Sequence, residues 1–202
     1  NNRNILTDWE NIIFHLPYAF HGRRMIINKW LDWMNENEII KDVYSEIGEP
    51  KSIDDVDWVK KVSKSNLYRK FIEDKIAPGE KASSEIGNMY TASIFMALIS
   101  SLVDAVENDK HFEDKKIGFI SYGSGSKAKI FEGTVQKNWI EKINSIKLYD
   151  SLSKRKKISI DVYENLHKRR VTSNINNNDG IIKLNKISDG EFTEGLRNYL
   201  KY

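Results

Sequence analysis

Residues 117–126 read Ile-Gly-Phe-Ile-Ser-Tyr-Gly-Ser-Gly-Ser, an apolar run that passes directly into small and polar residues. The apolar part, Ile117 to Ile120, is typical of a buried strand that ends in a loop. A second extended stretch, Ala128 to Val135, follows, and a mostly apolar helix from about Tyr90 to Val106 precedes the strand. Because strands alternate with helices along the chain, the sequence predicts an α/β fold.

Further elements are predicted on both sides of this centre. Ile12-Ile13-Phe14 is predicted to be a buried strand that leads into the loop at Pro17, since proline favours extended geometry in the residue before it. Pro78-Gly79 is predicted to break the chain. Residues 173–180 are Asn-rich and are interpreted as a loop, and residues 181–184 as a late strand. Apolar residues recur at helical spacing in five other segments, at 25–34, 54–62, 67–76, 139–152 and 159–169.

The composition is that of a folded, water-exposed protein. The 202 residues are 40% hydrophobic and 30% charged, with a net charge of only +3. No apolar run reaches the roughly 18–20 residues that span a bilayer, and the polar start, Asn1 to Asn4, is unlike a signal peptide, so we expect a cytoplasmic protein without membrane contact. The near balance of charges argues against nucleic-acid binding. The basic clusters 154–157 and 168–170 fit a solvated surface or a phosphate contact.

Three places could carry chemistry, and each also has a structural explanation. His15, at the end of a predicted strand, is either a core histidine or a general acid and base. Asn88, after Gly87, is either a helix cap or an amide held to bind a carbonyl group. The loop from Ser121 to Ser126 resembles a glycine-rich ligand loop but lacks the GxGxxG spacing. The four histidines show no metal-binding pattern, so no metal site is predicted.

Three segments together resemble one protein family, both in their order and in their spacing. They are His15-Leu16-Pro17-Tyr18, Gly87-Asn88-Met89-Tyr90-Thr91 and Ser121-Tyr122-Gly123-Ser124-Gly125. This arrangement is similar to the C-terminal half of the hydroxymethylglutaryl-CoA synthases. The resemblance is dense from Leu6 to Gln136 and looser toward Tyr202, where 161–164 and 169–170 look like the family's helix near the chain end.

The resemblance implies a thiolase-like fold, of which residues 1–202 would form the C-terminal domain, a mixed sheet flanked by helices. Family members condense acetyl-CoA with acetoacetyl-CoA to 3-hydroxy-3-methylglutaryl-CoA, a reaction of isoprenoid biosynthesis by the mevalonate pathway, without a further cofactor. A cysteine carries the acetyl group as a thioester, and a glutamate removes a proton from it. Both lie in the N-terminal half of family members. Because this chain has no cysteine, we expect it to be inactive alone, with an N-terminal half or partner chain supplying both groups, in an assembly that is commonly dimeric.

By the same resemblance, His15 matches the family's histidine, which orients acetoacetyl-CoA and exchanges protons near its thioester and ketone. Asn88 and Ser121 match residues that bind the substrate. Tyr90 is also a predicted substrate-binding residue, and Tyr90 and Tyr122 are expected to pack around the same cleft rather than to react. Preplaced donors of this kind can stabilise the alkoxide that develops when the ketone is attacked.

One departure from the family pattern concerns the acyl carrier. Family members usually have lysines five and nine residues after the histidine, near the CoA phosphates, whereas this chain has Phe20 and Arg24 there, with Arg23 alongside. Arginine can hold phosphate through paired hydrogen bonds, so Arg24 and Arg23 are the predicted CoA-binding residues. Phenylalanine cannot do so. The substrate could therefore be a free CoA thioester or a carrier-protein-bound β-ketoacyl group, as in β-branching synthases, and a non-catalytic CoA- or acyl-binding module is a further alternative.

Overall fold

The computed structural model describes residues 4–123, 126–170, 182–188, 190 and 197–201. These residues belong to two compact units, Asn1–Ser153 and Lys154–Tyr202. The site residues predicted from the sequence all lie in the first unit. Each unit is described by itself below.

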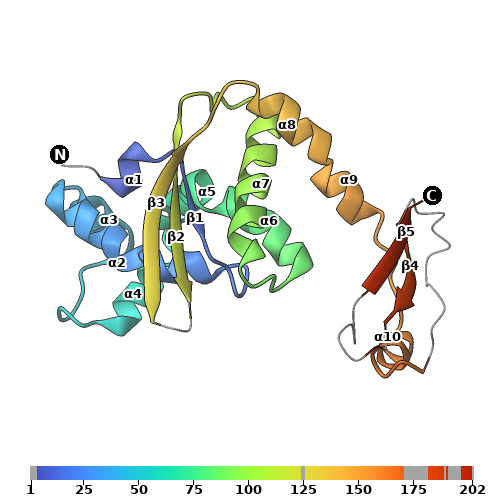
Figure 1. Ribbon diagram of the computed structural model, residues 1–202. Helices are drawn as coiled ribbons and strands as arrows, with labels where there is room; N and C mark the ends of the chain where they lie inside the picture. The colour runs from blue at the N-terminus through green and yellow to red at the C-terminus, as the bar shows by residue number, and fades with distance from the viewer. Residues whose placement is uncertain (1–3, 124–125, 171–181, 189, 191–196, 202) are drawn as a thin grey trace. The chain divides into compact units, whose positions relative to one another are not determined.

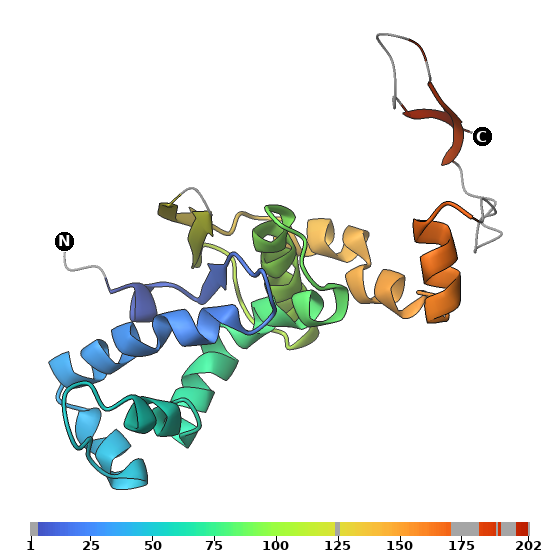
Figure 2. The same ribbon diagram turned by 90° about the horizontal axis from the view of Figure 1, so that it is seen from below.

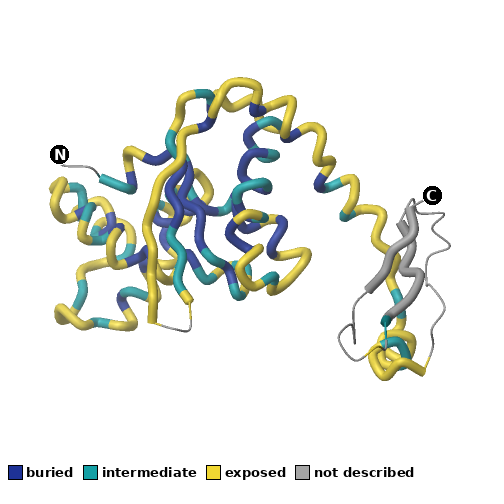
Figure 3. Tube along the Cα trace, viewed as in Figure 1, coloured by how far each residue is buried: buried dark blue, intermediate teal, exposed yellow. Residues whose placement is uncertain are grey.

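A three-stranded sheet forms the centre of the first unit (Figure 1). Strand β1 (Asn11–Phe14) pairs in parallel with β2 (Lys116–Gly123), and β2 pairs in the antiparallel sense with β3 (Lys127–Thr134). All four residues of β1 are buried, whereas all eight of β3 are exposed, and Figure 3 shows this gradient across the sheet. The mixed α/β architecture and the three predicted strands are therefore confirmed.

Helices pack around this sheet, as Figures 1 and 2 show from two sides. Several begin with the capping residues expected from sequence: the Asp55 side chain accepts a hydrogen bond from Trp58 N, and Ser65 Oγ accepts one from Tyr68 N. Each segment predicted to be helical in this unit is confirmed, although 139–152 breaks at the left-handed residue Lys147. The helices are α1 (Ile5–Asp8), α2 (His21–Glu36), α3 (Ile40–Ile47), α4 (Val56–Val62), α5 (Asn66–Lys75), α6 (Ala77–Ile86), α7 (Ala92–Glu107), α8 (Trp139–Ile146) and α9 (Leu148–Ser153).

The predicted chain break lies at Ile76, between α5 and α6, and not at Pro78-Gly79, which lie in the first turn of α6. Proline is tolerated there, since the first N–H groups of a helix have no intrahelical partner. The hydroxyl of Ser100 on α7 enters the next turn: it accepts a hydrogen bond from Ala82 N at 3.2 Å and donates one to Pro78 O at 2.6 Å. A side chain of the neighbouring helix thus replaces a backbone hydrogen bond of α6.

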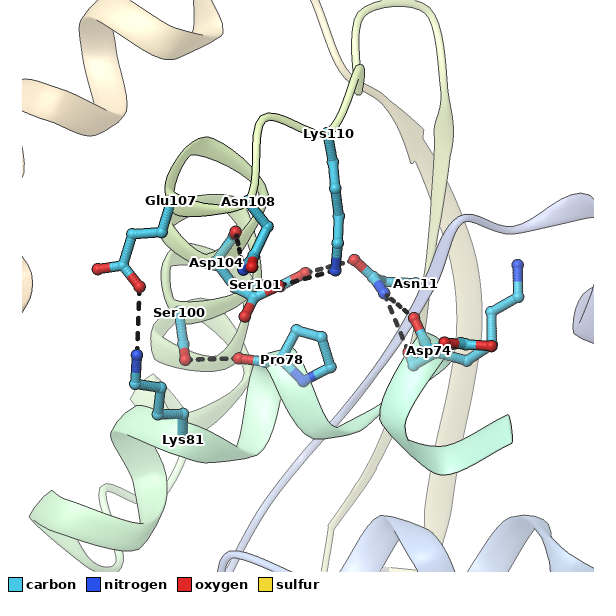
Figure 4. A network of polar contacts seen from close by, with 11 residues as sticks. Asn11, Asp74, Pro78, Lys81, Ser100, Ser101, Asp104, Glu107, Asn108 and Lys110 are labelled. Carbon is cyan, nitrogen blue, oxygen red and sulfur yellow. Dashed lines mark hydrogen bonds and ion pairs between the residues drawn. The ribbon is translucent and has the colours of Figure 1, made fainter. Parts of the chain in front are cut away.

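Polar contacts also fix β1 against the helices, as Figure 4 shows. The buried Asn11 donates from Nδ2 to the carbonyl of Asp74, at 3.0 Å, and accepts at Oδ1 from Ser101 Oγ, at 2.7 Å. These bonds connect β1 to the end of α5 and to the middle of α7. Because buried polar groups are costly when unpaired, this network favours one register of the helices along the strand.

The indole of Trp9 lies against Gly118 in the middle of β2. A Cβ atom added at Gly118 would lie 1.7 Å from Trp9 Cε3, a separation that real atoms do not reach. Trp9 is 4% exposed, and its Nε1 donates to Glu132 Oε2 on β3 at 2.9 Å. The glycine is therefore required for this close approach.

Replacing Gly118 by alanine should lower the free energy of unfolding by about 1–3 kcal/mol, because the indole must move out of its packed position. Gly133→Ala is the matched control, since its added Cβ would lie at an ordinary 3.6 Å from Phe119. Urea denaturation followed by tryptophan fluorescence measures both variants. Equal stability of the two variants would contradict the packing argument.

The described part of the second unit contains one helix and a two-stranded sheet. Helix α10 (Ile160–His167) is capped by Ser159, whose side chain accepts from Val162 N, so the predicted helix over 159–169 is confirmed. Strand β4 (Ile182–Ile187) pairs in the antiparallel sense with β5 (Arg197–Lys201), which confirms the late strand. The predicted loop over 173–180 lies outside the described residues.

Candidate active site

The predicted site lies where the parallel strands β1 and β2 end. The backbone N–H of His15 donates to Ile120 O at 3.0 Å, which extends the β1–β2 pairing one residue beyond Phe14. This places His15 beside the end of β2, where Ser121 and Tyr122 follow Ile120. Side chains at the carboxyl ends of parallel strands share one edge of a sheet, where α/β proteins commonly bind ligands.

Two side chains hold the half-buried ring of His15 in place. Nδ1 lies 2.9 Å from Ser93 Oγ, and the same hydroxyl accepts a hydrogen bond from Leu16 N at 3.0 Å. The ring of Tyr122 contacts the imidazole edge to face, with 5.2 Å between ring centroids and an interplanar angle of 79°. Because Ser93 is fully buried, this support is part of the core rather than of the surface.

A second histidine, His21, also lies near this tyrosine. Its ring centroid is 5.6 Å from that of Tyr122 and 4.7 Å from that of Tyr18. Burial, together with the nearby Tyr18, raises the pKa of the Tyr122 phenol. Tyr122 therefore stays neutral at physiological pH, and its ring contacts both imidazoles.

Asn88 lies in the short loop between α6 and α7. Its Oδ1 accepts a hydrogen bond from Tyr90 N at 2.7 Å, so the asparagine caps this turn and not the helix, whose N-cap is Thr91. The Nδ2 group makes no hydrogen bond within the described part of the chain, and it can donate outward. Gly87 and Tyr90 both have positive φ angles, 88° and 50°, and this conformation is costly for tyrosine. Ser93, which contacts His15, follows in the first turn of α7.

The two predicted CoA-binding arginines have different surroundings. Arg23 forms an ion pair with Glu80 on α6, with 2.6 Å between Nη2 and Oε2, and its guanidinium lies 4.8 Å from the ring centroid of Phe20. The Glu80 side chain is 2% exposed, and its Oε1 has no hydrogen-bond partner among the described residues. Burial raises the pKa of this carboxyl, and Arg23 offsets only part of that effect. Arg24 is exposed and makes no ion pair within the described residues.

Arg24 lines a cavity of about 870 Å³ between α2, α4 and α5. Lys60 and Arg69 line the same cavity, so three cationic side chains besides Arg23 converge on it. Apolar side chains, including Ile27 and Val59, form part of its wall. An anionic ligand with an apolar portion fits this combination of charge and surface.

Ser93, Glu80 and His21 were not identified from the sequence. Nothing local distinguishes Ser93 or Glu80 from other serines and glutamates. Their partners, His15 and Arg23, come from distant segments of the chain. The Tyr90 side chain is 78% exposed. Its role as a substrate-binding residue stays a prediction. Among the described residues, no group of histidines and acids has the geometry of a metal site, and no helix is long and apolar enough to cross a membrane.

Two solved structures share the fold of this chain over its whole length. A structure of MvaS in complex with 3-hydroxy-3-methylglutaryl coenzyme A has a TM-score of 0.69 and 23% identity, over 100% of this chain and 43% of that chain. The HMG synthase of the curacin biosynthetic pathway, in complex with holo donor-ACP, has a TM-score of 0.63 and 17% identity, over 100% and 45%. These likenesses show a thiolase-like α/β fold.

Sequence comparison shows the family itself. The family model of the hydroxymethylglutaryl-coenzyme A synthase C-terminal region matches residues 1–192, and the chain belongs to this family. A hydroxymethylglutaryl-CoA synthase from Haloferax volcanii is 31% identical over 170 residues, which are 79% of this chain and 38% of that protein. The chain thus spans well under half the length of this relative.

Proposed function

We propose that this chain supplies the substrate-orienting and proton-transferring part of a hydroxymethylglutaryl-CoA synthase. The observation that carries the proposal is the fixed position of His15, which Ser93 and Tyr122 hold at the joint end of two parallel strands. The nucleophilic cysteine and the glutamate base come from an N-terminal half or a partner chain, because this chain has no cysteine. We propose a cytoplasmic, dimeric assembly acting in the mevalonate pathway.

In this proposal, the chain's own side chains act on the acetoacetyl substrate. When the carbon of the enzyme-bound acetyl group bonds to the ketone carbon, the ketone oxygen gains negative charge and takes up a proton. The His15 imidazole can supply that proton, since a histidine gives and accepts protons near neutral pH. The outward Nδ2 of Asn88 can donate to a substrate carbonyl, and Ser121, next to His15 on β2, can add a further hydrogen bond. Water then hydrolyses the thioester on the partner's cysteine.

A reconstitution assay tests this proposal. The chain is mixed with an N-terminal half from a relative, acetyl-CoA and acetoacetyl-CoA, and the loss of acetoacetyl-CoA absorbance is followed. We expect no condensation by this chain alone and measurable condensation in the mixture. A stable complex without condensation would instead support a non-catalytic acyl-binding module.

The nucleotide end of CoA is proposed to bind at the cavity beside Arg24. Three cations line this cavity, and its volume suits part of a nucleotide. Arg23 contributes less, because Glu80 already holds its guanidinium. Phosphate is bound through charge-assisted hydrogen bonds of the kind that the exposed Arg24 can form.

Arg24→Ala should therefore weaken CoA binding about tenfold, the loss of one charge-assisted hydrogen bond. Binding of pantetheine, which lacks the nucleotide end, should not change. Isothermal titration of both ligands measures this, with Lys29→Ala as the control, since Lys29 is exposed on the same helix but does not line the cavity. An Arg24→Ala variant that bound CoA as well as wild type would place the nucleotide elsewhere.

A β-branching synthase that uses carrier-protein-bound substrates is the second candidate. Phe20, half exposed where relatives usually have a lysine, favours it, because a carrier-bound phosphopantetheine arm needs fewer nucleotide contacts. The curacin pathway synthase, with its holo donor-ACP, gives a structural precedent for this use of the fold. Free CoA remains our first choice, because the curated relatives with up to 36% identity are hydroxymethylglutaryl-CoA synthases.

A further inference from the structure

The hydroxyl of Ser93 contacts both the ring of His15 and the backbone N–H of the next residue, Leu16. It lies in the first turn of α7, is fully buried, and contacts Leu16 N at 3.0 Å and His15 Nδ1 at 2.9 Å. Within the described residues it has no third hydrogen-bond partner. Both hydrogen bonds of Ser93 Oγ are therefore made to His15 and Leu16.

The direction of these hydrogen bonds follows from the groups themselves. The Leu16 N–H can only donate, so Ser93 Oγ accepts from it. The single hydroxyl proton then has one acceptor within reach, His15 Nδ1. If Nδ1 carried the ring proton instead, the hydroxyl proton would be buried without an acceptor, which is unfavourable. That cost favours a neutral ring with an unprotonated Nδ1 and a proton on Nε2.

We propose that Ser93 is a positioning residue that fixes the tautomer of His15, so that Nε2 carries the proton and serves as a hydrogen-bond donor. Its importance for catalysis rests on the proposed function, in which His15 meets a carbonyl oxygen and later a developing alkoxide. An N–H group on Nε2 can donate a hydrogen bond to the carbonyl oxygen and to the alkoxide. Ser93 would then act on the reaction through His15 and without touching the substrate, as orienting partners of catalytic histidines do.

Nitrogen NMR of the chain itself tests this inference without substrate or partner chain. Long-range ¹H–¹⁵N correlation spectra at about pH 8, where an ordinary imidazole is neutral, distinguish a protonated ring nitrogen from an unprotonated one. A His15→Gln variant assigns the signal among the four histidines. In the wild-type chain we expect an unprotonated Nδ1 and a protonated Nε2. A protonated Nδ1 would overturn the proposal, whatever the variants do.

Two serine variants separate this role from a general effect of losing a buried hydroxyl. Ser93→Ala should give a mixture of both tautomers at His15. Ser101→Ala is the matched control, because Ser101 is also fully buried on α7 but bonds to Asn11, and its His15 signal should match wild type. An unchanged tautomer in Ser93→Ala, or the same change in Ser101→Ala, would refute the positioning role. Neither result bears on the reconstitution assay, which tests the proposed function by itself.

Discussion

Replacing Arg23 by methionine should lower the free energy of unfolding of the first unit by about 3–5 kcal/mol at neutral pH, the cost of leaving a buried charge without its partner. The partner is Glu80, which is 2% exposed and has one carboxylate oxygen paired with Arg23 and the other unpaired. The Arg23 side chain, in contrast, is 40% exposed. The loss therefore arises mainly from the carboxylate that remains in the core.

This loss should shrink as the pH falls. Burial raises the folded-state pKa of Glu80, and removing Arg23 removes the two contributions that lower it. A raised pKa means that the folded chain holds the proton more tightly than the unfolded chain. The resulting stabilisation is complete below the ordinary value of 4.5 and is lost as the pH rises through the raised value. The Arg23→Met variant should thus be closest to wild type under mildly acidic conditions.

Two further variants decide whether the buried charge is the cause. Adding Glu80→Leu to Arg23→Met should recover most of the stability, because well-packed apolar residues often replace a buried ion pair without loss. Lys60→Met removes an ion pair whose partners are 69% and 85% exposed, and it should cost less than about 1 kcal/mol. Urea denaturation measured by tryptophan fluorescence compares the variants across pH. An Arg23→Met loss as small as that of Lys60→Met would contradict the argument.

Replacing His15 by alanine should lower the turnover of the reconstituted two-part enzyme by about 10²–10⁴-fold, the usual contribution of a positioned acid or base. An imidazole commonly acts as a general acid or base, whereas burial raises the pKa of the neighbouring Tyr122 and keeps its phenol neutral. Loss of acetoacetyl-CoA absorbance at saturating substrate measures the turnover. Because the variant also leaves the buried Ser93 hydroxyl without its acceptor, urea denaturation of the variant is measured beside its turnover.

The control for this prediction is His111→Ala, because His111 is exposed in the loop before β2. That variant should retain wild-type turnover. Size-exclusion chromatography of each variant with the partner half separates a loss of chemistry from a loss of assembly. An unchanged rate in the His15→Ala enzyme, with assembly intact, would show that the role assigned to His15 is wrong.

Most elements of the first unit follow from local sequence patterns. The continuous apolar runs in β1 and in the first half of β2 indicate buried strands, and the helical spacing of apolar residues in α2, α5 and α7 indicates which face of each helix is buried. The break predicted at Pro78-Gly79 lies two residues earlier, at Ile76, because a proline fits the first turn of a helix, where the N–H groups have no intrahelical partner. The hydrogen bond from Ser100 Oγ to Pro78 O comes from another helix and has no local signal in the sequence.

The candidate site was also predicted in part from the sequence and in part decided by the tertiary structure. The three segments that contain His15, Asn88 and Ser121, in their order and spacing, were sufficient to predict the family, which the family model confirms, whereas the roles of these three residues stay predictions. The absence of cysteine from the sequence was sufficient to show that the chain cannot form the enzyme thioester by itself. These conclusions depend only on which side chains the sequence contains, because the reactions open to a chain are limited by the functional groups of its residues.

Only the tertiary structure decided how those groups are held. Ser93 reaches His15 across 78 residues, and Arg23 reaches Glu80 across 57. The cavity beside Arg24 is built from three separate helices. Hydrogen bonds and ion pairs act over a few ångströms in space, so their partners are set by the packing of helices on the sheet and leave no periodic signal in the sequence.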